Sequence, residues 1–201
     1  FNNRMNELKR KDKWFKDIIS EKEVTINNKK LLNASEIVEK LMDREQDFQP
    51  EFVGRWSHSD LHFSNVLIDE INDDFVLIDP RGYDYCDYYY DFGKLWHSVN
   101  GKYEMVANNL WEIDGANYKL NDIQIFHMLE EVKKELPKLF FKYSKENEED
   151  VMRKVEFNEA MHFITLVPFQ LEYNKYNYKA RVAYYIGVHL LNEFLNKYYH
   201  D

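Results

Sequence analysis

Three oxygen-bearing side chains near one short stretch have the types and spacing needed for chemistry on a phosphate group. They are Asp60 and Asn65, both within residues 58–65, and Asp79 at the end of a later apolar segment. Carboxylate and amide oxygens are the hard ligands that Mg²⁺ prefers, and phosphoryl transfer also needs a residue that orients the attacking hydroxyl. These residue types predict Asp60 as a catalytic base, with Asn65 and Asp79 as metal ligands.

Two short apolar segments would position these side chains. Val66–Asp69 and Val76–Asp79 each have the pattern of a short β-strand, and the polar residues 70–75 between them predict a turn. A hairpin of this kind returns the end of its second strand to the beginning of its first. We therefore expect Asp79 to lie beside Asn65, and the tight loop before the hairpin to direct its side chains into the same cleft.

The stretch resembles the catalytic loop of the aminoglycoside phosphotransferase and choline kinase group, which shares the eukaryotic protein kinase fold. That group typically has His-Gly-Asp-Leu-His-x-x-Asn and then a strand ending in Ile-Asp; this chain has His-Ser-Asp-Leu-His-Phe-Ser-Asn at 58–65 and Ile-Asp at 78–79. The resemblance continues through residues 80–82 and 90–95. Ser59 stands where the group has Gly, which adopts a positive φ without strain, so the sequence leaves the backbone at this position undecided.

The resemblance implies a mainly α fold with a small β-hairpin, equivalent to the helical C-terminal lobe of a protein-kinase-like fold. It implies an ATP- and Mg²⁺-dependent phosphotransferase, a small-molecule kinase. The acceptor would be a hydroxyl of a sugar, polyol, amino alcohol or aminoglycoside. The sequence does not distinguish among these acceptors, because helix-borne side chains of unknown mutual position select them.

The resemblance also implies support for the loop. His58 is expected to fix the loop through a hydrogen bond of its ring, and His62 either to do the same or to contact the acceptor. Residues 91–93 spell the Asp-Phe-Gly metal motif of protein kinases, yet no apolar strand precedes them, so the metal is assigned to Asp79. We expect Asp91 to open or cap a helix and to brace the loop.

Two further residues are candidates for contacting phosphate or substrate. Arg81 could reach a donor or acceptor phosphate, or it could pair with an acidic neighbour and brace the loop. Tyr83 begins a loop rich in Tyr and Asp, residues 83–90, whose rings could line an acceptor pocket or pack as half-exposed filler. The sequence leaves both pairs of alternatives open.

Composition limits the class of protein. The chain has 201 residues, 44% of them apolar, a net charge of −9 and a single cysteine, Cys86. The acidity argues against a nucleic-acid partner, and the lone cysteine fits a reducing cytoplasm. The longest apolar run, residues 163–169, is far shorter than the roughly 20 residues of a membrane span, and no secretory signal is visible. We predict a cytoplasmic protein without a membrane span.

The pattern predicts one domain over residues 1–201. Within it we expect leading helices in 1–50, the catalytic loop and metal hairpin in 51–82, and a helical body in 83–201. Hydrophobic periodicity predicts helices over residues 4–20, 34–46, 91–100, 103–113, 121–145, 148–173 and 175–199.

The first glycine is Gly54, so nothing ahead of Asp60 can form the Gly-rich loop that covers nucleotide phosphates in kinases. We therefore expect a piece of a longer protein, inactive alone, whose N-terminal lobe or fused domain carries most ATP contacts. A narrower resemblance, through residues 78–82 and 90–98, is to bacterial members encoded with surface-polysaccharide enzymes. Some of those members are fused to a sugar-nucleotidyltransferase domain.

Two other interpretations compete with the kinase. His58, Asp60 and His62 could form a metal-hydrolase cluster, since alternate positions of a strand can ligate one ion, but this leaves Asn65 unexplained. The chain could also be a catalytically silent, kinase-like binding or regulatory domain of a multidomain protein. Zinc content would distinguish the first from a kinase, and turnover after Asp60→Asn the second.

Overall fold

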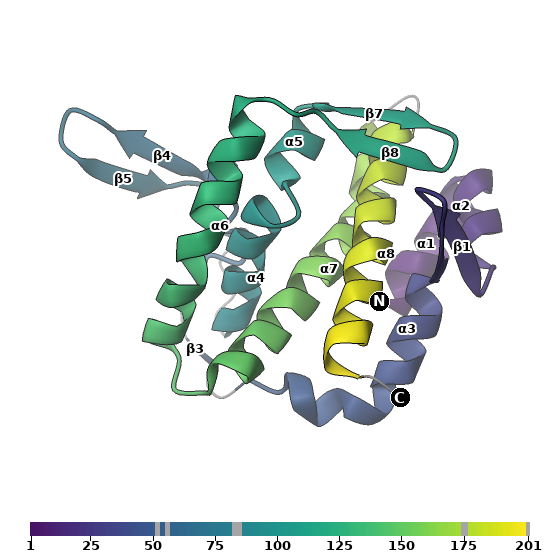
Figure 1. Cartoon of the computed structure of the whole chain (residues 1–201), viewed down its shortest axis with the longest axis horizontal. Helices are drawn as coiled ribbons and strands as arrows, with labels where there is room; N and C mark the ends of the chain where they lie inside the picture. Colours follow the sequence, from purple (N-terminus) through teal and green to yellow (C-terminus); the bar gives the residue numbers. More distant parts are fainter. Residues whose placement is uncertain (51–52, 55–56, 82–85, 174–176, 200–201) are drawn as a thin grey trace. The chain divides into compact units, whose positions relative to one another are not determined.

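The computed structural model describes residues 1–201 except 51–52, 55–56, 82–85, 174–176 and 200–201 (Figure 1). The helices are α1 (Asn2–Lys11), α2 (Lys13–Ile19), α3 (Ala34–Leu41), α4 (Tyr88–Val99), α5 (Tyr103–Ala107), α6 (Gln124–Tyr143), α7 (Glu148–Tyr173) and α8 (Tyr178–Tyr198), with the 3-10 helices η1 (Met42–Phe48) and η2 (Phe63–Asn65). The strands are β1 (Glu23–Ile26), β2 (Lys29–Leu32), β3 (Val53–Gly54), β4 (Val66–Asp69), β5 (Asp74–Leu77), β6 (Cys86–Asp87), β7 (Trp111–Asp114) and β8 (Asn117–Leu120).

The prediction of a mainly α chain is confirmed. The strands form antiparallel pairs β1–β2, β3–β6, β4–β5 and β7–β8, so strand pairs accompany the expected hairpin β4–β5. None of the described helices is long and apolar enough to cross a membrane.

Contacts divide the chain into two compact units that alternate along the sequence. Unit 1 comprises Phe1–Glu45, Met105–Asp122 and Ala160–Asp201, and unit 2 comprises Gln46–Glu104 and Ile123–Glu159. The sequence-predicted site residues that the structure describes all belong to unit 2. The single domain with three consecutive parts stays a prediction.

Unit 1 begins with two helices where the pattern predicted one. Asp12 is extended, with φ −144° and ψ 130°, and its side chain accepts a hydrogen bond from the Phe15 N–H at 3.2 Å. An aspartate in this conformation ends α1 and caps α2, so the continuous helix predicted over 4–20 is wrong. Asn27 and Asn28, with φ of 50° and 60°, then form the two-residue turn of the β1–β2 hairpin.

Other boundaries also differ from the predictions. The helix predicted over 103–113 is wrong: α5 ends at Ala107, and β7 follows with alternating half-buried and exposed residues. Gly115, in the turn between β7 and β8, has a φ of +58°. The helix expected over 34–46 ends as α-helix at Leu41 and continues as η1.

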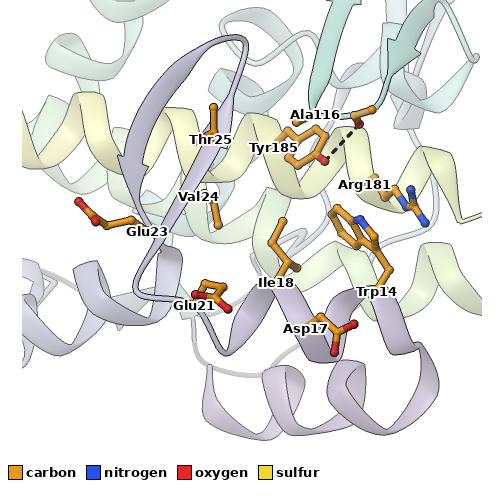
Figure 2. A pocket seen from close by; sticks show the side chains of 11 residues that line it. Trp14, Asp17, Ile18, Glu21, Glu23, Val24, Thr25, Ala116, Arg181 and Tyr185 are labelled. Carbon is orange, nitrogen blue, oxygen red and sulfur yellow. Dashed lines mark hydrogen bonds between the residues drawn. The ribbon is translucent and has the colours of Figure 1, made fainter.

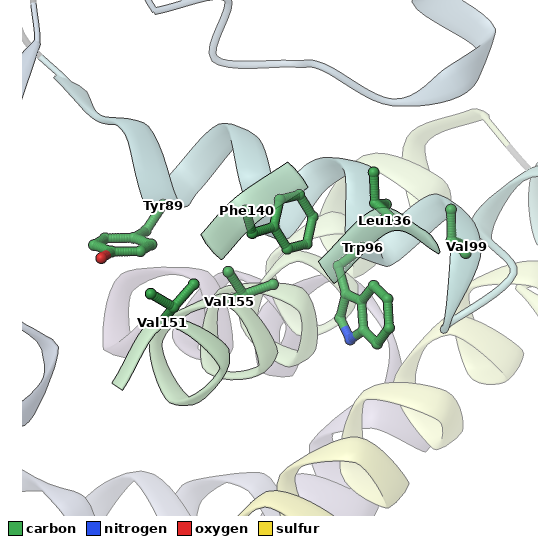
Figure 3. Packing of buried hydrophobic residues seen from close by; sticks show 7 residues of the cluster. All are labelled: Tyr89, Trp96, Val99, Leu136, Phe140, Val151 and Val155. Atoms are coloured by element: carbon green, nitrogen blue, oxygen red, sulfur yellow. The ribbon is translucent and has the colours of Figure 1, made fainter. Parts of the chain in front are cut away.

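Three helices build the core of unit 2 (Figure 3). The buried side chains are Tyr89, Trp96 and Val99 from α4, Leu136 and Phe140 from α6, and Val151 and Val155 from α7. A Cβ atom on Gly93 would lie 2.5 Å from the Asn158 Cβ, so only glycine allows α4 to approach α7 this closely. This packing holds α4, the helix that carries Asp91, in place.

Candidate active site

The loop ahead of β4 is held by its own backbone and by the Asn65 side chain. The His62 N–H donates to the Asp60 carbonyl at 2.9 Å, and the Asn65 N–H donates to the His62 carbonyl at 2.9 Å. Asn65 is 7% exposed, and its Nδ2 donates to the Asp60 carbonyl at 2.9 Å. Because the amide nitrogen is used in this way, the Oδ1 oxygen points to the other side of the amide group, where it can serve as a ligand.

The hairpin brings the backbone around Asp79 to this loop. Val66 pairs with Leu77, the Ile78 N–H donates to the Asn65 carbonyl at 3.0 Å, and the Arg81 N–H donates to the His58 carbonyl at 2.9 Å. Asp79 lies between these two contacts and is exposed. The second strand spans Asp74–Leu77 and not 76–79, so Ile78 separates Asp79 from the end of the strand.

Asp79 has a φ of +54°, in the left-handed region that residues other than glycine rarely occupy. Such a conformation costs on the order of 1–2 kcal/mol and is concentrated at functional sites, where the surrounding structure enforces it. The hydrogen bonds of Ile78 and Arg81 on either side supply that constraint.

The Asp60 carboxylate lies between two cations. The Lys94 Nζ is 2.9 Å from Oδ1, and the Arg81 Nε is 3.2 Å from Oδ2. Burial by itself would raise the pKa of the Asp60 carboxyl, but Lys94 and then Arg81 outweigh burial and hold that pKa below its ordinary value. Asp60 is therefore an ionised carboxylate at neutral pH.

Asp91 accepts hydrogen bonds from the backbone of the loop. Its Oδ2 accepts from the His58 N–H at 2.9 Å and its Oδ1 from the Ser59 N–H at 2.8 Å. Burial raises the pKa of Asp91, and these two hydrogen bonds oppose the rise. The expectation that Asp91 caps a helix is wrong, because α4 begins at Tyr88 and its cap is Asp87.

Ser59 and His58 each add a feature to the loop, the first a backbone conformation and the second a hydrogen bond. Ser59 is buried and has a φ of +61°, so the serine itself takes the positive φ that a glycine would adopt without strain. The His58 Nε2–H donates to the Ile78 carbonyl at 2.9 Å, which connects the loop to the segment that carries Asp79.

Replacing Asp91 by Asn is expected to lower the free energy of unfolding by about 1.5–3 kcal/mol, the contribution of a hydrogen bond to a charged group. The amide keeps one oxygen for one N–H but turns its own NH₂ group towards the other. Urea unfolding of Asp91→Asn beside Glu70→Gln, an exposed position in the hairpin turn, measures this difference. Equal midpoints for the two variants would show that the contacts to His58 and Ser59 contribute nothing.

One face of α4 holds the loop at successive points. Asp91 binds the backbone of 58–59, Lys94 binds the Asp60 side chain, and the Ser98 Oγ accepts from the Phe63 N–H at 3.1 Å. These three residues have the i, i+3, i+7 spacing of a single helix face. Sequence reasoning missed Lys94 and Ser98, although polar residues at this spacing on a largely apolar helix were a signal that could have found them.

His62 lies between two carboxylates. Its Nε2 is 4.0 Å from Asp60 Oδ1 and its Nδ1 is 4.0 Å from Glu104 Oε1, while its ring centroid is 4.9 Å from that of Tyr103. Burial lowers the pKa of His62, with Asp60 opposing the shift, and burial raises the pKa of Glu104. Tyr83 lies outside the described residues.

The metal-hydrolase interpretation gains no support from these contacts. Within the described ranges, no three His, Cys, Asp or Glu side chains are arranged to hold a metal ion. The His58 ring is directed to a backbone carbonyl. The two residues predicted to hold Mg²⁺ are Asn65 and Asp79. Because Asn65 would contribute an amide oxygen, they would form a different kind of metal site from a cluster of His, Cys, Asp and Glu.

Each of the two units also contains a hollow. One of about 450 Å³ in unit 1 has aromatic and acidic walls, and the Arg181 guanidinium lies 4.4 Å over the Trp14 ring within it (Figure 2). The other, of about 650 Å³ in unit 2, is apolar and lies along the β4–β5 hairpin. Its lining residues are Leu61, Phe63, Val66, Ile68, Phe75, Leu77, Leu95, Leu136 and Leu139.

Comparison with known proteins identifies the family. The family model described as "Phosphotransferase enzyme family" (APH) matches residues 7–119, more than half of the chain. No curated protein and no solved structure matches the chain. The match includes Asp60, Asn65 and Asp79 and confirms the resemblance to the aminoglycoside phosphotransferase and choline kinase group; it leaves the narrower one to polysaccharide-associated members untested. The chain belongs to the phosphotransferase enzyme family.

Proposed function

We propose that the protein is a small-molecule kinase that transfers the γ-phosphoryl group of ATP to a hydroxyl, with Mg²⁺ as the metal. One observation carries this proposal. The backbone contacts of Ile78 with Asn65 and of Arg81 with His58 hold the two predicted metal ligands on adjacent chain segments, next to the loop that carries Asp60. Membership of the family supports the same reaction type.

Each of the three side chains has a distinct task in this reaction. The ionised Asp60 carboxylate accepts the hydrogen bond of the acceptor hydroxyl and orients its oxygen for attack. The Oδ1 of Asn65 and the exposed carboxylate of Asp79 would hold the metal. When bound, Mg²⁺ supplies positive charge that offsets the charge of the donor phosphates.

Arg81 is the candidate for contact with a phosphate. Its side chain is 43% exposed and bonds Asp60 through Nε, which leaves its terminal nitrogens for a further anion. A guanidinium at this place can shift from the carboxylate towards a phosphoryl group, because both partners are anionic oxygens of similar geometry. This combines the two roles that the sequence left open.

The hairpin offers apolar surface beside the proposed metal ligands. Leu67 and Val76 pair across β4 and β5 and are 51% and 56% exposed. β4 begins directly after Asn65, and Asp79 follows β5 with only Ile78 between them. Because Leu67 and Val76 lie only a few residues along the chain from Asn65 and Asp79, they could contact the base of a nucleotide whose phosphates are bound at the metal.

The acceptor class is tested by a screen. The full-length protein is incubated with MgATP and a panel of choline, ethanolamine, sugars, polyols and aminoglycosides, and ADP release is measured. We expect one class to stimulate ADP release strongly, and EDTA to abolish the stimulation. If no compound with a hydroxyl group accepts a phosphoryl group while the protein still binds MgATP, the silent regulatory domain replaces the kinase.

A further inference from the structure

We propose that Lys94 is a positioning residue of the transfer reaction, which fixes the Asp60 carboxylate in the orientation that the acceptor hydroxyl meets. The proposal rests on the proposed function. The Lys94 Nζ lies 2.9 Å from Asp60 Oδ1, within a charge-assisted hydrogen bond. No metal, phosphate or substrate contact is needed for this role, because Lys94 acts through Asp60.

The two cations on Asp60 differ in how firmly they are placed. Lys94 is 8% exposed and extends from α4, a helix packed into the core of unit 2. Arg81 has a side chain that is 43% exposed and follows the hairpin in an irregular segment. Lys94 therefore holds Oδ1 the more firmly, and Oδ2, which the exposed Arg81 contacts, is the oxygen that faces the acceptor in this proposal.

The position of Lys94 on its helix supports this assignment. Asp91, one turn earlier on the same face, binds the His58 and Ser59 N–H groups, and Ser98, one turn later, binds the Phe63 N–H. Lys94 lies between them and is the member of this row that reaches a side chain of the loop and not its backbone. The same helix face thus sets the path of the loop and the rotamer of its carboxylate.

Stability alone gives a poor reason for a lysine at this point. Burying an ammonium and a carboxylate costs desolvation energy that their attraction roughly repays, so apolar residues of similar volume often serve a fold equally well. A fixed carboxylate does matter for reaction, since a misplacement of about 1 Å can lower a rate by about 100-fold. The ion pair is therefore placed where orientation has the largest effect.

The test is a double-mutant cycle in the full-length protein with the acceptor that the screen identifies. Lys94→Met keeps the volume of the side chain and removes its charge, and it is expected to lower kcat by about 10- to 100-fold with little change in the KM for ATP. Lys94→Arg keeps the charge and should lose less. In an Asp60→Asn background, Lys94→Met should cause no further loss, because residues that act as a unit are not additive.

The matched control is Lys154→Met. Lys154 is 6% exposed, belongs to unit 2 and forms an ion pair with Glu146, so this variant also removes a buried, paired lysine. It should lower the melting temperature without lowering kcat. If Lys94→Met fails to fold, Lys94→Arg and its combination with Asp60→Asn decide the same question.

Two results would overturn the proposal. One is a kcat for Lys94→Met equal to that of the wild type; the other is an equal loss with and without Asp60, which would indicate general destabilisation. Either result would leave the kinase intact if Asp60→Asn still abolishes transfer. Absence of any loss in Asp60→Asn would instead refute the proposed function and the role of Lys94 with it.

Discussion

Replacing Asp60 by Asn in the full-length protein is expected to lower kcat by about 10²- to 10⁴-fold, the usual contribution of a correctly placed catalytic carboxylate. Asn has nearly the same shape but carries no charge, so it cannot accept the hydroxyl proton or attract it as strongly. The variant also leaves the buried Lys94 ammonium without its carboxylate partner, and a lower melting temperature should accompany the loss of turnover.

Glu70→Gln is the matched control for this experiment, because it makes the same chemical change at an exposed residue of the β4–β5 turn. Steady-state rates with saturating MgATP and acceptor should be unchanged in the control. Turnover of Asp60→Asn within a few-fold of the wild type would favour a domain whose family chemistry is silent, with any activity residing in another part of the protein.

Replacing Asp79 by Asn is expected to have the second largest effect, a fall in kcat/KM for MgATP of more than about 100-fold. Loss of a group that supports a metal ligand from behind already costs about 10- to 100-fold, and Asp79 is proposed as a ligand itself. Asn is the suitable replacement because it tolerates the left-handed conformation at this residue, where φ is +54°, so the backbone is retained. The Mg²⁺ concentration needed for half-maximal turnover should rise.

Asp73→Asn is a closely matched control for Asp79→Asn. Asp73 lies in the turn of the same hairpin and also has a positive φ, of 51°, so the substitution and the backbone conformation are the same. Its kinetics should match those of the wild type. An unaltered Mg²⁺ dependence in Asp79→Asn would remove Asp79 from the metal site and return the question to Asp91 in the Asp-Phe-Gly run.

Local patterns in the sequence were sufficient to predict the hairpin beside the candidate site. The two short apolar segments and the turn residues of 66–79 predicted the hairpin, whose register sets Val66 opposite Leu77 and lets the Ile78 N–H bond the Asn65 carbonyl. The absence of an apolar strand before Asp91 separated it from Asp79, and the structure places Asp91 in a helix. The hairpin prediction succeeded because it depended on residues close together in the chain, and the assignment of the metal to Asp79 stays a prediction.

Predictions that depended on distant contacts were weaker. The ion pair of Lys94 with Asp60 joins positions 34 residues apart, and it follows only from the packing of α4 against α6 and α7. The run from Tyr103 to Ile113 has helical periodicity, yet β7 forms there because its partner strand β8 follows the turn at Gly115. Ser59 shows a third limit, since the family's glycine at this position allows a positive φ and a serine rarely adopts one, so the sequence could not decide the conformation that the structure shows.

The proposed metal site is best tested by a structure of the full-length protein with Mg²⁺ and a non-hydrolysable ATP analogue. We expect one cation with oxygen ligands from both Asn65 and Asp79 at about 2.0–2.1 Å, the distance that Mg²⁺ requires. We also expect the Asp60 carboxylate to face the terminal phosphate across the space for an acceptor hydroxyl. A nucleotide-bound cation held by other side chains, with Asn65 and Asp79 both turned away from it, would refute the proposed metal site.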